Sequence, residues 1–156
     1  MKLEISHRDL CLLGSSYMKK HGIAKWQKPT YVVCELERSN AECPDIFGFG
    51  SAYTQLIEVK ISRSDFLSDK KKYWRKNSDK GLGQLRSYLC PYGMINVDEL
   101  PEKWGLLYFQ DDVIVCVKEP EIQIANSMQE MNLAASILRR ENIKSQIFSY
   151  KRYESD

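Results

Sequence analysis

The chain has 156 residues, of which 43% are hydrophobic and 28% are charged. This balance is ordinary for one folded domain with its own core and argues against disorder. The formal net charge is only +2, so composition alone indicates no nucleic-acid partner. Two histidines in the whole chain are too few for a His-rich zinc hydrolase or a nuclease built on paired histidines. We read no membrane-spanning run and no signal peptide, and we therefore expect a cytoplasmic protein without a membrane partner.

The five cysteines are scattered along the chain and never have the C-x-x-C spacing. Several lie in apolar runs, such as Cys34 in "YVVCEL" and Cys116 in "VIVCV". We therefore expect buried, reduced thiols, and neither disulfides nor a zinc site.

The first half of the chain predicts one helix followed by three strands. Ser6 and Asp9 have the spacing of a capping box, and Gly22 follows a basic last turn, so the helix is expected over residues 7–21. Runs rich in β-branched and aromatic residues then predict the strands, which span 30–37, 44–49 and 54–61. Their connections are too short for crossovers, which predicts an antiparallel meander with a turn at 50–53.

The second half predicts a helix, a strand, a hairpin and a final helix. Ser62 and Asp65 form a second capping box for a helix over about 63–76. The segment 84–90 is ambiguous between helix and strand, and we favour a strand. "WGLLYF" and "VIVCVK" predict the hairpin, and Ser127 with Glu130 predicts a third capping box. The last helix is expected over 128–141, with one core face that carries Met128, Met131, Ala135 and Leu138.

These elements predict an α/β fold: a three-layer sandwich with a central mixed sheet, formed by residues 1–156 as a single domain. On the third strand, Glu58 and Lys60 point to one face because residues two apart share a side. Asp45 begins the preceding strand, so a hairpin that turns near residues 50–53 brings it beside them. Two close carboxylates repel each other unless a cation lies between them, and oxygen ligands of this kind suit Mg²⁺ or Mn²⁺.

The combination of "PD" at 44–45 and "EVK" at 58–60 resembles the PD-(D/E)XK nuclease superfamily, which has a restriction-endonuclease-like αβββαβ core. The resemblance implies that Asp45 and Glu58 bind Mg²⁺ (or Mn²⁺) together with the backbone carbonyl of Val59. It also implies that Lys60 is the catalytic lysine. Alone, a Glu-x-Lys on a strand is more often a solvated sheet face than a metal site.

The resemblance also implies an additional upstream acid among the catalytic residues. We assign it to Glu35, inside the first strand, while Glu42 is the rival. The continuation "ISRSDFLSDKKKYWR" is similar to small single-domain members from bacteria and phages. Gln84 and Tyr88 also fit a Gln-x-x-x-Tyr element of some families, although this match decides little.

A basic run at 70–80, "KKKYWRKNSDK", directly follows the candidate site. Such a run is usually a solvated helix face, but cations beside aromatic residues also suit a phosphate backbone and a stacked base. The residues expected to bind nucleic acid are Lys70, Lys71, Trp74, Arg75, Lys76, Gln84 and Arg86.

We therefore expect a metal-dependent nuclease that hydrolyses DNA phosphodiester bonds, in DNA repair or in phage or mobile-element DNA processing. A chain of this size leaves no room for a separate sequence-reading domain, so action directed by DNA structure or by a partner is expected. One alternative is a nucleic-acid-binding or partner-binding module without catalysis, and another is an RNA-directed nuclease. Because many such folds act inside assemblies, a homodimer or a larger protein assembly stays open.

Overall fold

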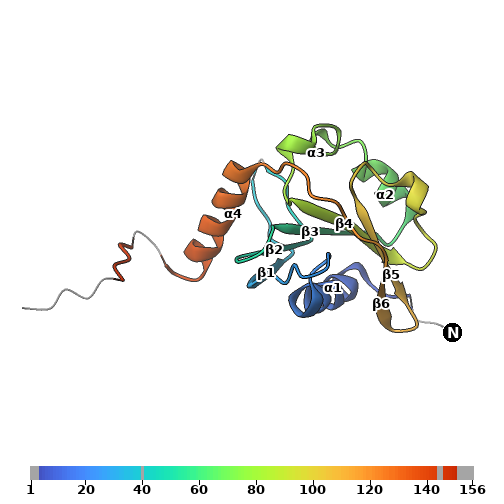
Figure 1. Ribbon diagram of the computed structural model, residues 1–156, viewed down its shortest axis with the longest axis horizontal. Helices are drawn as coiled ribbons and strands as arrows, with labels where there is room; N and C mark the ends of the chain where they lie inside the picture. The colour runs from blue at the N-terminus through green and yellow to red at the C-terminus, as the bar shows by residue number, and fades with distance from the viewer. Residues whose placement is uncertain (1–3, 40, 144–145, 151–156) are drawn as a thin grey trace, which may run out of the picture.

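The computed structural model describes residues 4–39, 41–143 and 146–150, which include a six-stranded mixed sheet (Figure 1). The strands lie side by side in chain order. They are β1 (Tyr31–Cys34), β2 (Ile46–Phe49), β3 (Gln55–Val59), β4 (Leu85–Pro91), β5 (Gly105–Gln110) and β6 (Val113–Lys118). The pairs β1–β2, β2–β3 and β5–β6 are antiparallel, whereas β3–β4 and β4–β5 are parallel. This arrangement confirms the predicted α/β fold with a mixed sheet.

The described helices flank this sheet. The α-helices are α1 (His7–His21), α2 (Arg63–Asp69), α3 (Tyr73–Lys76) and α4 (Ser127–Arg140), and the short 3₁₀ turns are η1 (Ser78–Lys80) and η2 (Val97–Glu99). In Figure 1, α1 lies below the sheet, α2 and α3 lie above it, and α4 lies beyond β1 and β2. Within the described ranges, none of these helices combines the length and the apolar character needed to cross a bilayer.

Helix α1 has the predicted bounds. The Ser6 side chain accepts a hydrogen bond from the Asp9 N–H, and the helix ends at Gly22 with a backbone φ of 71°. Its buried residues include Leu10 and Cys11, which pack with Ile57 and other residues of the sheet. Burial of this apolar face against the strands fixes the position of the helix.

The meander β1–β2–β3 is confirmed, and its register decides which residues meet. Ile46 pairs with Ile57, and continuing this antiparallel register places Asp45 opposite Glu58. Odd-numbered residues of β3, such as Ile57, contact the core on the α1 side. Even-numbered residues, such as Leu56, contact the core beside α2. Strand β3 is therefore buried on both faces, and any charged residue on it needs partners within the protein.

The prediction of a single helix over 63–76 is wrong, because the structure contains two short helices in this segment. The cap is as predicted, since the Ser62 side chain accepts from the Asp65 N–H. However, α2 ends at Asp69, and Lys72 adopts an extended conformation before α3 begins. The break allows Lys72 and Arg75 to reach the same Asp69 carboxylate.

The final helix differs from the prediction in its cap and its buried face. Asn126, one residue before Ser127, is the N-cap and accepts a hydrogen bond from the backbone of Gln129. Met128, Met131 and Leu138, predicted to lie in the core, are all exposed. Leu133 is the fully buried residue of α4, and it packs with Leu36, Phe47 and Leu82. The helix contacts the rest of the protein along a different stripe from the one expected.

The cysteines also differ in part from the expectation. All five are free thiols, and Cys11 and Cys90 are buried, as expected. Cys43 and Cys116, however, are exposed. Cys116 lies on β6, the edge strand of the sheet, where Val115 and Val117 beside it are exposed as well.

Candidate functional site

Asp45 lies at the point where the β2–β3 ladder ends. The backbone N–H of Val59 donates to Asp45 Oδ2 at 2.8 Å, so this side chain replaces a ladder bond of the backbone. The predicted proximity of Asp45 to the end of β3 is confirmed. Besides burial, the charge of Asp45 raises the pKa of Glu58, because the two carboxylates repel each other electrostatically.

Glu58 and Lys60 project together toward the α2 side, as predicted. Lys60 Nζ lies 3.4 Å from Glu58 Oε2 and 3.4 Å from Asp69 Oδ1. The Lys60 backbone N–H donates to Leu89 O at 2.9 Å, which anchors the residue to β4. The ammonium group thus lies between two buried carboxylates, and only 7% of Lys60 is exposed.

Glu58 is a buried acid whose two oxygens have different surroundings. Oε2 faces Lys60, whereas Oε1 lies 3.4 Å from Arg75 and makes no hydrogen bond within the described residues. Burial raises the pKa of Glu58 to about 8, with Asp45 and Asp69 acting in the same direction and Arg75 and Lys60 opposing it. Burial and the neighbouring acids therefore oppose ionisation of Glu58, and an added cation beside it would favour the ionised form.

Arg75 organises the buried charges on this side of the sheet. Its guanidinium contacts Glu42 Oε1 at 2.6 Å and Asp69 Oδ2 at 2.8 Å. Burial opposes ionisation of Asp69, but Arg75 and Lys60 outweigh it and hold the pKa of Asp69 below its usual range. The hydroxyl of Tyr88 also donates to Asp69 Oδ2 at 2.6 Å. This network fixes the ammonium of Lys60 through Asp69.

Of the two candidates for the additional upstream acid, Glu35 does not lie where the sequence suggested. Glu35 follows the last residue of β1, is exposed and has a left-handed φ of 52°, so its placement inside a strand was wrong. Its backbone N–H donates to Asp45 O, which ties it to the site. Glu42 is buried, accepts from the Leu82 N–H and pairs with Arg75, so it acts within the ion network.

Sequence reasoning missed a second group of residues around Asp45, on the α1 side. His7 Nε2 lies 3.5 Å from Asp45 Oδ1, and the Cys11 thiol lies 3.6 Å from His7 Nδ1. His7 Nδ1 is also 3.9 Å from Glu35 Oε1. The spacing of four residues between His7 and Cys11 could have indicated a shared helix face, but no local pattern showed that Asp45 lies against it.

Two arginines expected to bind nucleic acid are not available for it. The side chain of Arg75 is 1% exposed and is used within the ion network. Arg86 is also 1% exposed and donates to the carbonyl oxygens of Ser78, Gly83 and Ile124. Both arginines stabilise the interior, so we correct their assignment to phosphate contact.

The other residues expected to contact nucleic acid differ in their exposure and in their partners. Lys71 and Lys76 are exposed, and Lys70 is exposed while its Nζ donates to Glu99 O. Trp74 is half-buried, with its indole N–H buried and unpaired within the described residues. The side chain of Gln84 accepts from the Thr54 N–H and therefore serves the β3–β4 contact. Exposed cations thus lie beside the candidate site, but fewer than expected.

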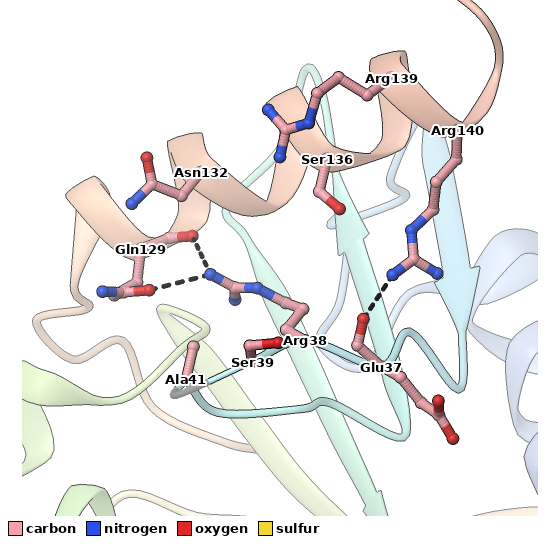
Figure 2. Close-up of a pocket in the computed structure, with 9 residues that line it drawn as sticks. All are labelled: Glu37, Arg38, Ser39, Ala41, Gln129, Asn132, Ser136, Arg139 and Arg140. Carbon is pink, nitrogen blue, oxygen red and sulfur yellow. Dashed lines mark hydrogen bonds between the residues drawn. The ribbon is translucent and has the colours of Figure 1, made fainter.

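Figure 2 shows a polar groove between α4 and the connection from β1 to β2. It has a volume of about 680 Å³, and its lining includes Arg38, Arg139 and Arg140. Arg38 is held by the backbone and side chain of Gln129, and Arg140 donates to Glu37 O (Figure 2). The groove therefore presents an ordered basic surface, with Arg139 projecting from α4 (Figure 2).

Comparisons with known proteins bear on the fold alone. No protein-family model matches this chain. No curated protein matches it either. A solved structure of a protein of unknown function from Silicibacter pomeroyi is similar, with a TM-score of 0.59 over 94% of this chain and 100% of that chain. The two sequences are 21% identical, so the similarity is one of fold.

Proposed function

We propose that this protein is a metal-dependent nuclease of the PD-(D/E)XK type, with Asp45, Glu58 and Lys60 as its catalytic residues. The observation that carries the proposal is that the start of β2 and the end of β3 bring Asp45 against Val59, the residue after Glu58, with Lys60 beside Glu58. The order α1, β1–β3, α2–α3, β4, with β4 parallel to β3, is also what the αβββαβ resemblance implies.

The donor atoms present suit a small divalent cation. Asp45 and Glu58 supply carboxylate oxygens, and Val59 supplies a backbone carbonyl. Glu58 Oε1 is buried without a hydrogen bond within the described residues, which is the condition of an oxygen that can accept a cation. When bound, Mg²⁺ or Mn²⁺ would polarise the phosphate and lower the pKa of a water molecule.

The residues of the chain then have separate roles. Asp45 is fixed by the Val59 N–H, so its orientation is set before any ligand arrives. Lys60 supplies a positive charge that can orient a water molecule or neutralise charge that develops on the phosphate. Asp69, itself held by Arg75 and Tyr88, positions that ammonium.

Two surfaces would hold the nucleic-acid backbone. Lys71 and Lys76 supply cations on the α3 side of the site. The groove of Figure 2 supplies Arg139 and Arg140, which lie beside the connection between β1 and β2. Contacts of this kind bind phosphates and carry no sequence information, which supports an action directed by DNA structure or by a partner.

A nucleic-acid-binding module without catalysis is the second candidate. It is favoured by one observation: Arg75 and Lys60 already contact both oxygens of Glu58, which is 2% exposed. In that case the buried charges would only stabilise the fold, and the basic surfaces alone would act.

A cleavage assay separates these candidates. Plasmid DNA, single-stranded DNA and RNA are each incubated with Mg²⁺ or Mn²⁺ and with the wild-type, Lys60→Ala or Lys25→Ala protein. The proposal predicts metal-dependent cleavage that is lost in Lys60→Ala and retained in Lys25→Ala, which alters an exposed lysine outside both proposed binding surfaces. Melting curves in EDTA check that Lys60→Ala is folded. Background-level products from the wild type with every substrate would defeat the nuclease proposal, and cleavage of RNA alone would replace DNA as the substrate.

A further inference from the structure

Three side chains with different metal-binding atoms converge on the α1 side of Asp45. They are His7 and Cys11 of α1 and Asp45 at the start of β2, and their ligand atoms all lie within 4.8 Å of one another. His7 and Cys11 are four residues apart and therefore share one helix face. Asp45 is held from its other oxygen by the Val59 N–H, so Oδ1 points to the imidazole.

The separation between His7 and Asp45 fits a tetrahedral ion. Metal–ligand bonds of about 2.0–2.2 Å to nitrogen or oxygen and about 2.3 Å to sulfur imply edges of roughly 3.4 Å between N and O and roughly 3.5 Å between N and S. His7 Nε2 lies 3.5 Å from Asp45 Oδ1 and 3.9 Å from Cys11 Sγ. Cys11 Sγ also lies 3.6 Å from His7 Nδ1, and the ligand atoms of the three residues are separated by up to 4.8 Å, so Cys11 must move toward the other two ligand atoms to complete the geometry.

The atom types select the kind of ion. A thiolate, an imidazole and a carboxylate together suit Zn²⁺ and similar transition metals, whereas Mg²⁺ requires oxygen ligands. We propose that His7, Cys11 and Asp45 form a transition-metal site of the Zn²⁺ class. The ion would displace the thiol proton of Cys11, so one proton is released on binding.

Glu35 lies next to the proposed ligand His7 and is not itself a proposed ligand. Its Oε1 lies 3.9 Å from His7 Nδ1, the nitrogen that stays free when Nε2 binds the ion. A carboxylate beside that nitrogen orients a ligand imidazole and strengthens its binding. Glu35 is thus a positioning residue for His7, which differs from the role the sequence suggested.

The proposed site shares Asp45 with the proposed nuclease centre but differs from it in chemistry. Glu58 projects to the α2 side, whereas Cys11 packs in the core on the α1 side. The transition-metal site therefore goes beyond the proposed function, and it can be tested without any nucleic acid.

Cobalt(II) provides the test, because a Co²⁺–thiolate bond gives an intense near-ultraviolet charge-transfer band. The EDTA-stripped wild-type protein is titrated with Co²⁺, and we expect the thiolate band together with the strong visible absorption of tetrahedral Co²⁺. Zn²⁺ should abolish both signals at equimolar amounts, and Mg²⁺ should leave them unchanged. Cys11→Ser should lose the band, while Cys116→Ser, which alters an exposed thiol, should retain it.

Two further variants guard against misfolding. His7→Gln, at a partly exposed side chain, should lose the tetrahedral absorption while melting like the wild type in EDTA. Glu35→Gln should weaken Co²⁺ binding by about 10- to 100-fold. The inference is overturned if the wild type gives no thiolate band, if that band persists in Cys11→Ser, or if the tetrahedral absorption persists in His7→Gln. None of these outcomes depends on whether the protein cleaves DNA in Mg²⁺, so the two proposals fail separately.

Discussion

Replacing Arg75 by methionine tests the buried ion network most sharply. The guanidinium lies 2.6 Å from Glu42, 2.8 Å from Asp69 and 3.4 Å from Glu58, and it also packs 4.8 Å from the centre of the Trp104 ring. Removing one partner of a buried ion pair costs about 3–5 kcal/mol because the remaining charge is left uncompensated. Here two carboxylates, those of Glu42 and Asp69, lose the same cation, so we expect a loss of at least about 3 kcal/mol near neutral pH.

The loss should depend on pH in a defined direction. Without Arg75, the folded-state pKa values of Glu58 and Asp69 rise, so the native variant binds protons more tightly than the native wild type does. The stability deficit of the variant relative to the wild type should therefore grow as the pH rises and shrink under mildly acidic conditions.

Urea unfolding in EDTA, followed by circular dichroism at several pH values, measures this effect. Lys76→Met is the matched control, because Lys76 lies on the same helix, is exposed, and should change stability by less than about 0.5 kcal/mol. If Arg75→Met unfolded at the same urea concentration as Lys76→Met and had lost only DNA affinity, the assignment of Arg75 to the interior would be refuted.

Three further predictions concern other parts of the molecule. Burial raises the pKa of Glu58 to about 8, so the stabilising contribution of its carboxyl group is complete below about pH 4.5 and is lost as the pH rises through 8. In EDTA, Glu58→Gln should therefore melt at the same temperature as the wild type near pH 5 and at a higher temperature near pH 9. Leu133→Ala should cost about 2–5 kcal/mol in urea unfolding, whereas Met128→Ala, on the exposed face, should cost less than about 0.5 kcal/mol. A Cβ on Gly105 would lie 2.6 Å from Lys118 O and 2.5 Å from Ser87 Oγ, so Gly105→Ala should lower the melting temperature.

Much of the fold could be predicted because its signals are local. Ser6 and Ser62 cap their helices as the spacing to Asp9 and Asp65 indicated. The meander followed from strand alternation and short connections, and the approach of Asp45 to β3 followed from the length of the hairpin. These features depend on residues that are close in sequence.

The remaining features depend on contacts between distant segments. The run "KKKYWRK" looks like a solvated face, yet the break before α3 turns Arg75 toward Glu42, which lies 33 residues earlier. Arg86 is buried because carbonyl groups of residues 78–83 and of Ile124 surround its guanidinium. A charged residue therefore could not be assigned to the surface or the interior from composition alone.

The same limit explains α4 and the α1 side of Asp45. The apolar residues of α4 are compatible with more than one buried face. Leu133 is the residue that is buried, because it packs against Leu36 and Phe47. His7 and Cys11 share a helix face, but their relation to Asp45 is set by how α1 packs on the sheet. Tertiary packing therefore made the choice in both cases.

The central claim is that Asp45 and Glu58 support metal-dependent hydrolysis of nucleic acid. The most direct measurement is the cleavage rate of an end-labelled single-stranded DNA as Mn²⁺ is titrated, compared between the wild type and Asp45→Asn, with both shown to be folded in EDTA. The account predicts a rate that rises and saturates with Mn²⁺ for the wild type and stays at background for Asp45→Asn. Equal cleavage by both proteins at every Mn²⁺ concentration would contradict it.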